Sequence, residues 1–453
     1  MSATPPAPPD NLPADLHDLY TDHLAALQDG YARALDATGY DAVVIHSGLA
    51  AAHSSFDDQY WPHKPTPAFA HWLPLTAADT SLLVEPGKRP VLLQVALDNF
   101  WDSEPEPESD HFWGSFDESE VAAPERVAER LPRGRVAFIG DARERAASWG
   151  LADTAINPPD LLAALDQLRA HKSDYERACM ATANRRAAAG HAAVLAAFAE
   201  GEPAELDLHL LYLRITRQDD SQTPYKNIVA MDENAAILHH VNYRHRPPMH
   251  RNQSLLIDAG ATCLGYASDI TRTAVKGVNG GAAATFAELI RAVEEVQAEV
   301  CRRVEIGKEY ETLHDETHHL LGAALGRIGV ARASAEELVD SGATRCFLPH
   351  GLGHSLGVQV HDVGCRLRPP RSENPFLRNT TTIAAGQVFT IEPGCYFIDS
   401  QMAQLRERPV AAAIDWDLVD ALAHFGGVRI EDNIAVREDG ITNLTRDNWP
   451  PSP

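Results

Sequence analysis

Four acidic residues lie inside apolar, strand-like runs of this chain, and their placement constrains the fold more than any other feature. The runs are SLLIDAG, YASDITRT, VFTIEPG and GGVRIEDN, which carry Asp258, Asp269, Glu392 and Glu431. A carboxylate is costly to bury and is rarely buried unless it is paired or bound to a metal. One such residue would more often be a surface or salt-bridged residue. Four together predict strands that direct their carboxylates to one site; the first two runs, joined by a Gly-containing connection, predict a hairpin.

A histidine-rich segment, PHGLGHSLGVQVHD at residues 349–362, supplies partners for these carboxylates. It contains His350, His354 and His361 between glycines and apolar residues. This pattern suits a loop that leads into a strand and turns its side chains toward one cleft, because a strand alternates its faces with a period of two. Alone the segment would prove little, but together with the carboxylates it predicts a metal site.

The candidate metal ligands are Asp258, Asp269, His354, Glu392 and Glu431. Four carboxylates and one imidazole are too many for one closed zinc site. They suit two divalent ions that share bridging carboxylates, about 3.5–4 Å apart, with an open position for a hydroxide. A set dominated by oxygen favours a hard or borderline ion, so Mn²⁺ is expected first and Co²⁺ or Zn²⁺ are the alternatives.

The order and surroundings of these residues resemble the metallopeptidases with the pita-bread fold, family M24, and among them the bacterial prolidases, or Xaa-Pro dipeptidases. The matching stretches span nearly the whole chain: DDQYWPHKPTPAFAHWLP, PYKNIVAMDENAAILH, PHGLGHSLGVQVHD, NPFLRNT, TIEPGCYF and FGGVRIEDN. The resemblance implies the fold, a dinuclear metal site, and hydrolysis of dipeptides that end in proline by attack of a metal-bridging hydroxide.

The resemblance also implies catalytic roles. Glu392 would act as the general base besides binding metal. His361 and His239 would hydrogen-bond the scissile carbonyl and the tetrahedral intermediate, and Tyr396 would assist the transition state. The chain departs from the family at His240, where the family usually has Tyr, so the surroundings of His239 are expected to differ.

Substrate-binding residues form a second group. Arg378 matches the family residue that binds the free carboxylate of the substrate, for which a planar guanidinium is suited. His350, Tyr225 and Leu238 are expected to line the pocket. Arg429 lies two residues before a candidate ligand on the same strand-like run, so it is expected to orient a carboxylate or to stabilise charge.

Composition limits the classes of partner. A chain of 453 residues has room for two or three domains, and a formal net charge of −25 argues against nucleic acid or an anionic membrane as a partner. The six cysteines include no CxxC pair, the first residues lack the features of a signal peptide, and no apolar run approaches 18 residues. These features favour a cytoplasmic protein in a reducing compartment.

Residues 1–172 mix helical and strand patterns and predict a small α/β domain. Residues 173–453 predict an α+β catalytic domain, in which a curved, mostly antiparallel sheet is backed by helices. The helices that periodicity and propensity predict cover residues 16–38, 174–200, 204–217, 286–304, 310–328 and 335–341.

Several alternatives remain at the level of sequence. An aminopeptidase P-like enzyme would accept longer peptides, and phosphotriesters are a further substrate class that the same site could take. A metal-free binding protein would have lost its ligands, which the complete set in this chain opposes. Residues 56–74 are rich in aromatic side chains; they pack on their own domain or, as the family implies, help to close the active site of a partner subunit in a homodimer.

Overall fold

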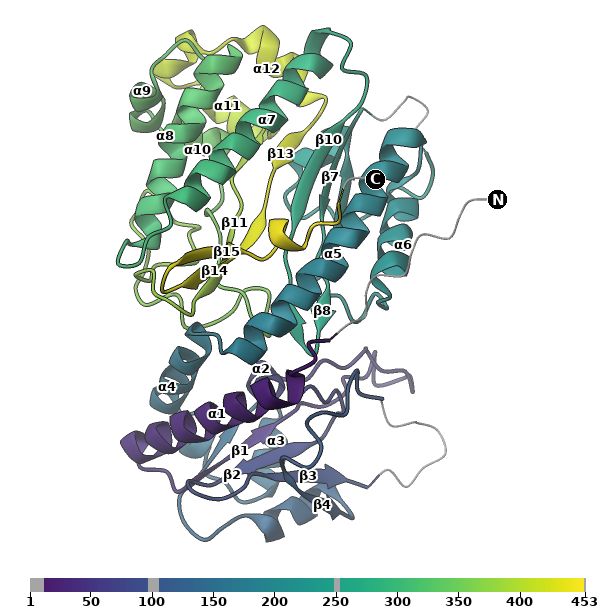
Figure 1. Cartoon of the computed structure of the whole chain (residues 1–453), viewed down its shortest axis with the longest axis vertical. Helices are drawn as coiled ribbons and strands as arrows, with labels where there is room; N and C mark the ends of the chain where they lie inside the picture. The colour runs from purple at the N-terminus through teal and green to yellow at the C-terminus, as the bar shows by residue number, and fades with distance from the viewer. Residues whose placement is uncertain (1–11, 97–105, 248–252, 452–453) are drawn as a thin grey trace. The chain divides into compact units, whose positions relative to one another are not determined.

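The computed structural model describes residues 12–96, 106–247 and 253–451 (Figure 1). The chain forms two compact units. The smaller one contains Leu12–Cys179 and Cys263–Tyr266, and the larger one contains Met180–Thr262 and Ala267–Pro453. Helix α5 (Asp174–Glu200) crosses from one unit to the other. The domain boundary at residue 172 stays a prediction from the sequence.

The smaller unit is built on a mixed five-stranded sheet with the order β4-β3-β2-β1-β5. Strand β1 pairs antiparallel with β2 and parallel with β5, and β3 pairs antiparallel with β2 and parallel with β4. The strands are β1 (Ala42–His46), β2 (Ser81–Val84), β3 (Val91–Val95), β4 (Asp117–Val121) and β5 (Val136–Ile139). This arrangement confirms the predicted α/β domain.

Helices α1 (Leu16–Thr38) and α4 (Pro159–Ala170) pack against each other in this unit. Helix α1 has the predicted bounds, and it ends at Gly39, whose positive φ of 72° terminates the helix in the left-handed region. The shorter helices of the unit are α2 (Pro67–Ala70), η1 (Pro124–Arg130), α3 (Arg143–Ser148) and η2 (Asp153–Ala155).

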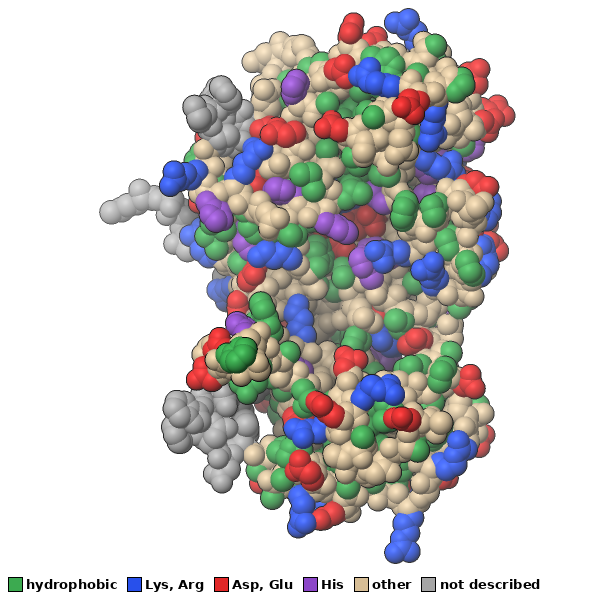
Figure 2. Space-filling view, turned by 180° about the vertical axis from the view of Figure 1, so that it is seen from behind, with side chains coloured by type: hydrophobic (Ala, Val, Ile, Leu, Met, Phe, Trp, Pro, Cys, Tyr) green, Lys and Arg blue, Asp and Glu red, His purple; other side chains and the backbone are tan. Residues whose placement is uncertain are grey.

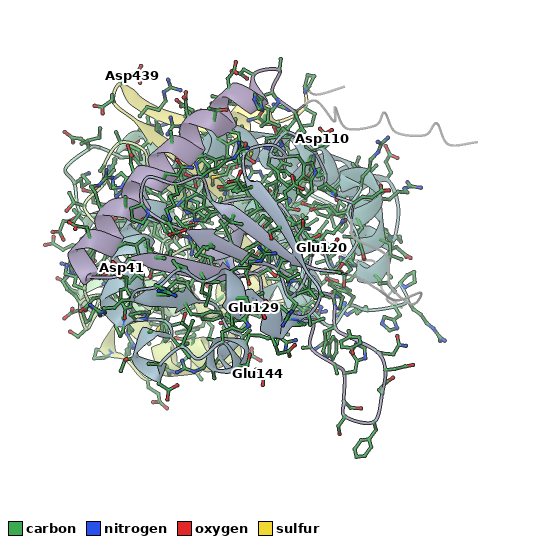
Figure 3. All side chains as sticks on the ribbon, turned by 90° about the horizontal axis from the view of Figure 1, so that it is seen from below. Asp41, Asp110, Glu120, Glu129, Glu144 and Asp439 are labelled. Atoms are coloured by element: carbon green, nitrogen blue, oxygen red, sulfur yellow. The ribbon has the colours of Figure 1, made fainter. Side chains whose placement is uncertain are left out.

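Exposed carboxylates carry much of the negative charge of the smaller unit. Asp41, Asp110, Glu120, Glu129 and Glu144 are exposed to solvent, and Figure 3 labels them. Solvated charges of this kind are inexpensive, and they keep a protein dispersed. Carboxylates that are buried are therefore the exceptions that need an explanation.

The larger unit combines small antiparallel sheets with helices. One sheet has the order β10-β7-β6, a second has the order β11-β14-β15, and a third pair is β12-β13; the short pair β8-β9 has residues in both units. The strands are β6 (Ile228–Met231), β7 (Ser254–Asp258), β8 (Thr262–Cys263), β9 (Tyr266–Ala267), β10 (Thr271–Val275), β11 (Val388–Ile391), β12 (Gly394–Tyr396), β13 (Gly427–Arg429), β14 (Asp432–Arg437) and β15 (Gly440–Asn443).

Helices α7 and α8 lie side by side over these strands (Figure 1). The helices of the unit, besides α5, are α6 (Glu205–Thr216), η3 (Asp232–Ala236), α7 (Gly281–Arg302), α8 (Tyr310–Ile328), α9 (Ala335–Asp340), α10 (Ala343–Phe347), α11 (Asp399–Arg406), η4 (Pro409–Ala413), α12 (Trp416–Ala423) and η5 (Arg446–Asn448). The predicted helices are confirmed, and α7 begins earlier than predicted because its first turn, GAAAT, is helix-forming but lacks apolar periodicity. Within the parts of the chain that the structure describes, none of the helices has the length and apolar character needed to cross a membrane.

The histidine-rich segment at residues 349–362 does not lead into a strand, so that prediction was wrong. The segment is irregular apart from one bridge between Ser355 and Phe389. Its glycines let it lie directly on β11: a Cβ atom at Gly353 would be 2.2 Å from the backbone oxygen of Thr390. Close backbone approach and backbone hydrogen bonds to β11, such as that from the Thr390 N–H to the His354 carbonyl at 2.9 Å, therefore hold this segment in place.

Candidate metal centre

The strand ends of the larger unit bring the predicted acidic residues together. Strands β7 and β10 form the predicted hairpin, in which Thr271 pairs with Asp258 at the end of β7. Asp269 lies just before β10, Glu392 just after β11, and Glu431 between β13 and β14. Figure 2 shows several histidine side chains close to acidic ones on one face of this unit.

His354 lies between two of the carboxylates. Its Nε2 is 3.4 Å from Oδ2 of Asp269 and 3.6 Å from Oε1 of Glu392. Donor atoms of Asp269, His354 and Glu431 all lie within 4.8 Å of one another, and the three residues are buried. All five predicted ligands are thus part of, or next to, one cluster.

Hydrogen bonds of the backbone fix the orientation of His354. Its Nδ1 donates to the carbonyl oxygen of Ser355 at 3.0 Å, so the Nε2 lone pair faces the carboxylates. Its backbone N–H donates to Oγ1 of Thr390, and this hydroxyl lies 3.3 Å from Oε1 of Glu392. A histidine whose second ring nitrogen donates to a carbonyl has the usual arrangement of a metal ligand.

The electrostatics of the cluster fit a bound cation. Burial raises the pKa of Glu392 to about 7. The charges of His354 and Arg429 lower this pKa, whereas repulsion from Asp269 and Asp258 raises it further.

Burial, followed by repulsion from neighbouring carboxylates, also raises the pKa of Glu431 and of Asp269. Oε1 of Glu431 is buried and has no hydrogen-bond partner among the described residues. Several buried carboxylates cannot all be ionised without positive charge, and an oxygen-rich set with one imidazole suits divalent metal ions. The residues present therefore fit the metal ions that the sequence predicts.

Asp258 is held by two neighbours. Arg429 forms an ion pair with its Oδ2, and the hydroxyl of Tyr225 lies 2.7 Å from its Oδ1. The same hydroxyl lies 2.5 Å from Oδ1 of Asp269, so Tyr225 contacts both aspartates. Tyr225 was predicted to be a pocket wall, and the structure adds that its hydroxyl contacts two of the candidate ligands.

Arg429 also contacts the hydroxyl of Tyr396, which lies beside His350. Its Nη1 donates to the hydroxyl of Tyr396 at 2.7 Å, and that hydroxyl lies 3.0 Å from Nε2 of His350. Nδ1 of His350 donates to the carbonyl of Gly351 and lies 3.8 Å from Oε2 of Glu392. Burial, and next the charge of Arg429, lower the pKa of His350 to about 3, so this imidazole is neutral.

His361 packs against the candidate ligand His354, with ring centroids 4.4 Å apart and ring planes at 86°. Burial, and then the neighbouring His354, Arg378 and His239, lower the pKa of His361 to about 3. These influences show that Arg378 and His239 lie near His361; both side chains are exposed. Leu238, next to His239, is half-buried against the hydrophobic core.

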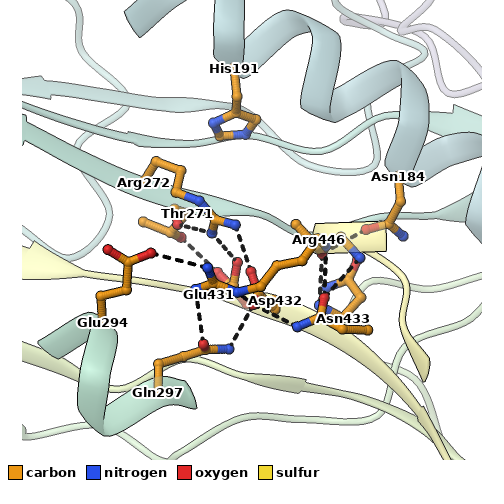
Figure 4. A network of polar contacts seen from close by, with 12 residues as sticks. Asn184, His191, Thr271, Arg272, Glu294, Gln297, Glu431, Asp432, Asn433 and Arg446 are labelled. Carbon is orange, nitrogen blue, oxygen red and sulfur yellow. Dashed lines mark hydrogen bonds and ion pairs between the residues drawn. The ribbon is translucent and has the colours of Figure 1, made fainter. Parts of the chain in front are cut away.

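A network of polar contacts behind the centre holds the strands together (Figure 4). Asp432 pairs with Arg272 at 2.7 Å and with Arg446 at 2.6 Å, and it accepts a hydrogen bond from Gln297. These contacts neutralise a fully buried carboxylate that directly follows Glu431. The charge of Asp432 is therefore compensated within the protein, unlike that of the candidate ligands.

Sequence reasoning missed two residues of this region. The side chain of Asn433 forms two hydrogen bonds with the backbone of Asp269. Its Oδ1 accepts from the Asp269 N–H at 3.0 Å, and its Nδ2 donates to the Asp269 carbonyl. Thr271 donates from Oγ1 to Oε2 of Glu431. Thr271 lies two residues after Asp269, on the same face of the strand, so the strand period could have identified it.

Comparisons with known proteins agree with this architecture. Residues 178–438 match the model of metallopeptidase family M24, and residues 18–167 match that of the Xaa-Pro dipeptidase N-terminal domain. A Xaa-Pro dipeptidase of Pseudoalteromonas atlantica is 40% identical over 443 residues, which cover 95% of this chain and 98% of the relative. One of Yersinia pestis is 38% identical over 445 residues, covering 95% and 98%.

A solved structure of aminopeptidase P from E. coli has the same fold, with a TM-score of 0.72 and 21% identity, covering 93% of this chain and 95% of that one. The two units are thus an N-terminal domain and a pita-bread catalytic domain, and the predicted fold class is confirmed. Since the family model covers more than half of the chain and the relatives cover nearly all of it, the chain belongs to metallopeptidase family M24.

Proposed function

We propose that this metallopeptidase is a Xaa-Pro dipeptidase, which hydrolyses dipeptides before a C-terminal proline with two divalent ions at the candidate metal centre. The observation that carries the proposal is the convergence of His354, Asp269 and Glu431 donor atoms within 4.8 Å in a buried, oxygen-rich cluster. The names of the full-length relatives support the same substrate class.

Asp258, Asp269, His354, Glu392 and Glu431 would hold the ions, with Mn²⁺ expected first and Co²⁺ or Zn²⁺ as alternatives. When bound, the ions would supply a nucleophile from water at neutral pH and would polarise the scissile carbonyl. Glu392 is the proposed general base: it accepts the proton of the attacking water and passes it to the leaving proline nitrogen.

Two imidazoles, of His361 and His239, would stabilise the charge that develops on the carbonyl oxygen. His361 is neutral at physiological pH and lies against His354, and His239 is exposed near it. A neutral imidazole can donate one N–H to an oxyanion. Tyr396 is the proposed third donor: its hydroxyl accepts from Arg429 and lies 3.0 Å from Nε2 of the neutral His350, so its proton would move from that nitrogen to the carbonyl oxygen.

Arg378 is the proposed anchor for the proline carboxylate. Its side chain is exposed, and within residues 12–96, 106–247 and 253–451 no hydrogen bond or ion pair of its guanidinium is found. A guanidinium in this state is available for a bidentate bond to a carboxylate. His350, Tyr225 and Leu238 complete the proposed pocket, Tyr225 also through its contacts with the aspartates.

The proposal is tested with metal-depleted protein that is reconstituted with Mn²⁺. Gly-Pro and Leu-Pro should be hydrolysed and Ala-Pro-Ala should not, and elemental analysis should find two ions per chain. The Asp269→Asn variant should lose metal and activity together. Faster release of Ala from Ala-Pro-Ala would favour an aminopeptidase P-like enzyme, and absence of bound metal would favour a binding protein. A phosphotriester tested in the same assay would measure the side activity that the sequence left open.

A homodimer is the proposed assembly. Phe56 is 99% exposed, Tyr60 60% and Trp61 59%, in a segment where Ala52 and Tyr60 form a bridge. Large exposed aromatic side chains that lie close in sequence are typical of surfaces that meet a partner. Light scattering of the parent and of a Phe56→Ser, Trp61→Ser double variant should show a dimer for the first and a monomer for the second. The cytoplasmic location stays a prediction.

A further inference from the structure

We propose that the smaller unit has a separate cation site, in which His23, His71 and Glu176 bind one divalent ion of the Zn²⁺ or Co²⁺ class. The three residues share no member with the candidate metal centre, so the inference does not depend on the proposed function. All three side chains are buried, with exposed fractions of 2%, 3% and 3%.

Three elements that are distant in sequence bring these ligands together. His23 lies on α1, His71 directly follows α2, and Glu176 lies in the first turn of α5. One donor atom from each lies within 4.8 Å of the other two. Nε2 of His71 is 3.4 Å from Oε1 of Glu176, and Nδ1 of His23 is 4.0 Å from Oε2 of Glu176.

These separations are close to those of a tetrahedral site. Ligand atoms about 2.0–2.1 Å from a zinc ion lie about 3.3–3.4 Å from one another. The distance between His71 and Glu176 already has this value, whereas Nδ1 of His23, 4.0 Å from Oε2 of Glu176, would have to move toward the ion. Two imidazoles and one carboxylate form a donor set that Zn²⁺ and Co²⁺ accept.

The tautomer of His23 suits a metal ligand. Its Nε2 lies 2.9 Å from the carbonyl oxygen of His71, which can only accept, so Nε2 carries the proton. Nδ1 therefore has its lone pair on the side of the cluster, where it accepts from the hydroxyl of Ser173 at 2.8 Å; a bound ion would take the place of this hydroxyl. Burial also lowers the pKa of His23 to about 4, which keeps the imidazole neutral.

Glu176 provides a buried negative charge. Burial alone would raise its pKa, but the neighbouring His71 and His23, followed by Lys172, lower it below the ordinary value, so the carboxylate is ionised. Oε2 accepts from the backbone N–H of Ser173 at 2.8 Å, and Ser173 Oγ accepts in turn from the Glu176 N–H at 3.3 Å.

This reciprocal pair is a capping box at the start of α5. It accounts for Oε2 of Glu176, whereas the second oxygen, Oε1, is paired with Nε2 of His71 at 3.4 Å. A bound ion would replace this pair. A bound ion would join α1, the segment after α2 and the first turn of α5, and the site would therefore stabilise the smaller unit.

The experiment uses the full-length protein and Zn²⁺ as the probe. Parent, His71→Ala and Glu176→Gln proteins are saturated with Zn²⁺ and desalted, and bound zinc is counted per chain by elemental analysis. Each variant should contain one zinc ion fewer than the parent, whatever the number at the candidate metal centre. His53→Ala is the matched control, since His53 is an exposed histidine of the same unit, and it should retain the parental zinc content.

Folding and activity are measured on the same samples. Circular dichroism should show a folded chain, and after reconstitution with Mn²⁺ the variants should hydrolyse Leu-Pro as the parent does. If His71→Ala fails to fold, Glu176→Gln, which preserves the shape of the side chain, decides the question. Equal zinc contents in the parent and in the folded variants would overturn the proposal and leave a metal-free hydrogen-bonded cluster.

Discussion

Thr271 donates a hydrogen bond of 2.7 Å from its hydroxyl to Oε2 of Glu431, across the bridge that joins these two residues. The direction of this bond is set by Arg429, whose Nε donates to the same hydroxyl oxygen at 3.1 Å. Because a guanidinium can only donate, the proton of Thr271 is left to point at Glu431. A chain of hydrogen bonds thus orients a carboxylate whose other oxygen has no partner among the described residues.

We therefore expect Thr271→Val to weaken metal binding without unfolding the protein. The variant keeps the shape of the side chain and removes the donor, and loss of a partner of this kind typically lowers metal affinity by about 10–100-fold. Titration of metal-depleted protein with Mn²⁺ measures the effect. Thr442→Val, on strand β15, is the control and should bind as the parent does. Equal affinities in all three proteins would show that the bond to Glu431 does not orient a ligand.

A second prediction concerns the pH dependence of stability. Glu311 on α8 accepts hydrogen bonds from the backbone N–H of Arg371 at 2.8 Å, from Arg368 at 2.7 Å and from Asn374 at 3.2 Å. Burial opposes ionisation of Glu311, but these bonds outweigh it and lower its pKa to about 2. A carboxylate whose pKa is lower in the folded than in the unfolded protein stabilises the fold. This stabilisation is complete above the unfolded-state pKa of about 4.3, and it is lost as the pH falls toward the folded-state pKa of about 2.

Replacement of Glu311 by Gln should therefore destabilise the protein at pH 7 and have a smaller effect at pH 3. Urea unfolding of the parent and of Glu311→Gln at pH 7, 5, 4 and 3 measures the difference. Glu336→Gln changes an exposed carboxylate of the same unit and should show no such trend. A difference between the parent and Glu311→Gln that stays constant down to pH 3 would contradict the assigned pKa.

Local patterns in the sequence were sufficient for the helices and for the hairpin that carries two aspartates. Helices α1, α5 and α8 have the predicted bounds because their apolar periodicity and their propensity agree. The hairpin of β7 and β10 was predicted from alternation and a turn. These features depend on neighbours in sequence, which a single sequence contains.

Contacts between distant segments were not predictable in the same way. No regular strand forms in residues 349–362, although the segment is hydrogen-bonded to β11 through its backbone and approaches Thr390 closely at Gly353. The contact of Tyr225 with Asp258 and Asp269 needs the side-chain geometry of three segments. Asn433 likewise accepts a hydrogen bond from the backbone of Asp269, which lies 164 positions earlier in the chain. The set of candidate ligands could be predicted, whereas the hydrogen bonds that orient it required the structure.

His361→Ala should keep its metal ions and lose most of its turnover. The residue lies against His354 without being one of the proposed ligands, and its neutral imidazole is the proposed donor to the carbonyl oxygen. Loss of one such donor typically lowers kcat by about 10²–10³-fold. Elemental analysis and Leu-Pro kinetics are measured together, with His424→Ala, an exposed histidine on the same unit, as the control. A parallel fall of metal content and activity would assign His361 to metal binding instead.

The last prediction concerns why the enzyme should stop at dipeptides. Arg378 is exposed and lies near His361. The segment that precedes it is held by Glu311, which accepts hydrogen bonds from Arg368, Arg371 and Asn374. A guanidinium at this position would bind the free carboxylate that directly follows the cleaved bond, and this carboxylate is absent from an amide or a longer peptide.

The parent should therefore strongly prefer Leu-Pro to Leu-Pro-amide, and Arg378→Ala should lose that preference. A hydrogen bond to a charged group contributes about 1.5–3 kcal/mol, which corresponds to about a 10–150-fold change in relative kcat/KM. Arg366→Ala, which removes another exposed arginine twelve positions earlier, should retain the parental ratio. Arg378→Lys keeps the charge but not the planar fork, so it should recover only part of the preference. If the ratio of the two rates is the same in the parent and in Arg378→Ala, the carboxylate is bound elsewhere, and the limit to dipeptides must come from the shape of the pocket around Leu238 and His350.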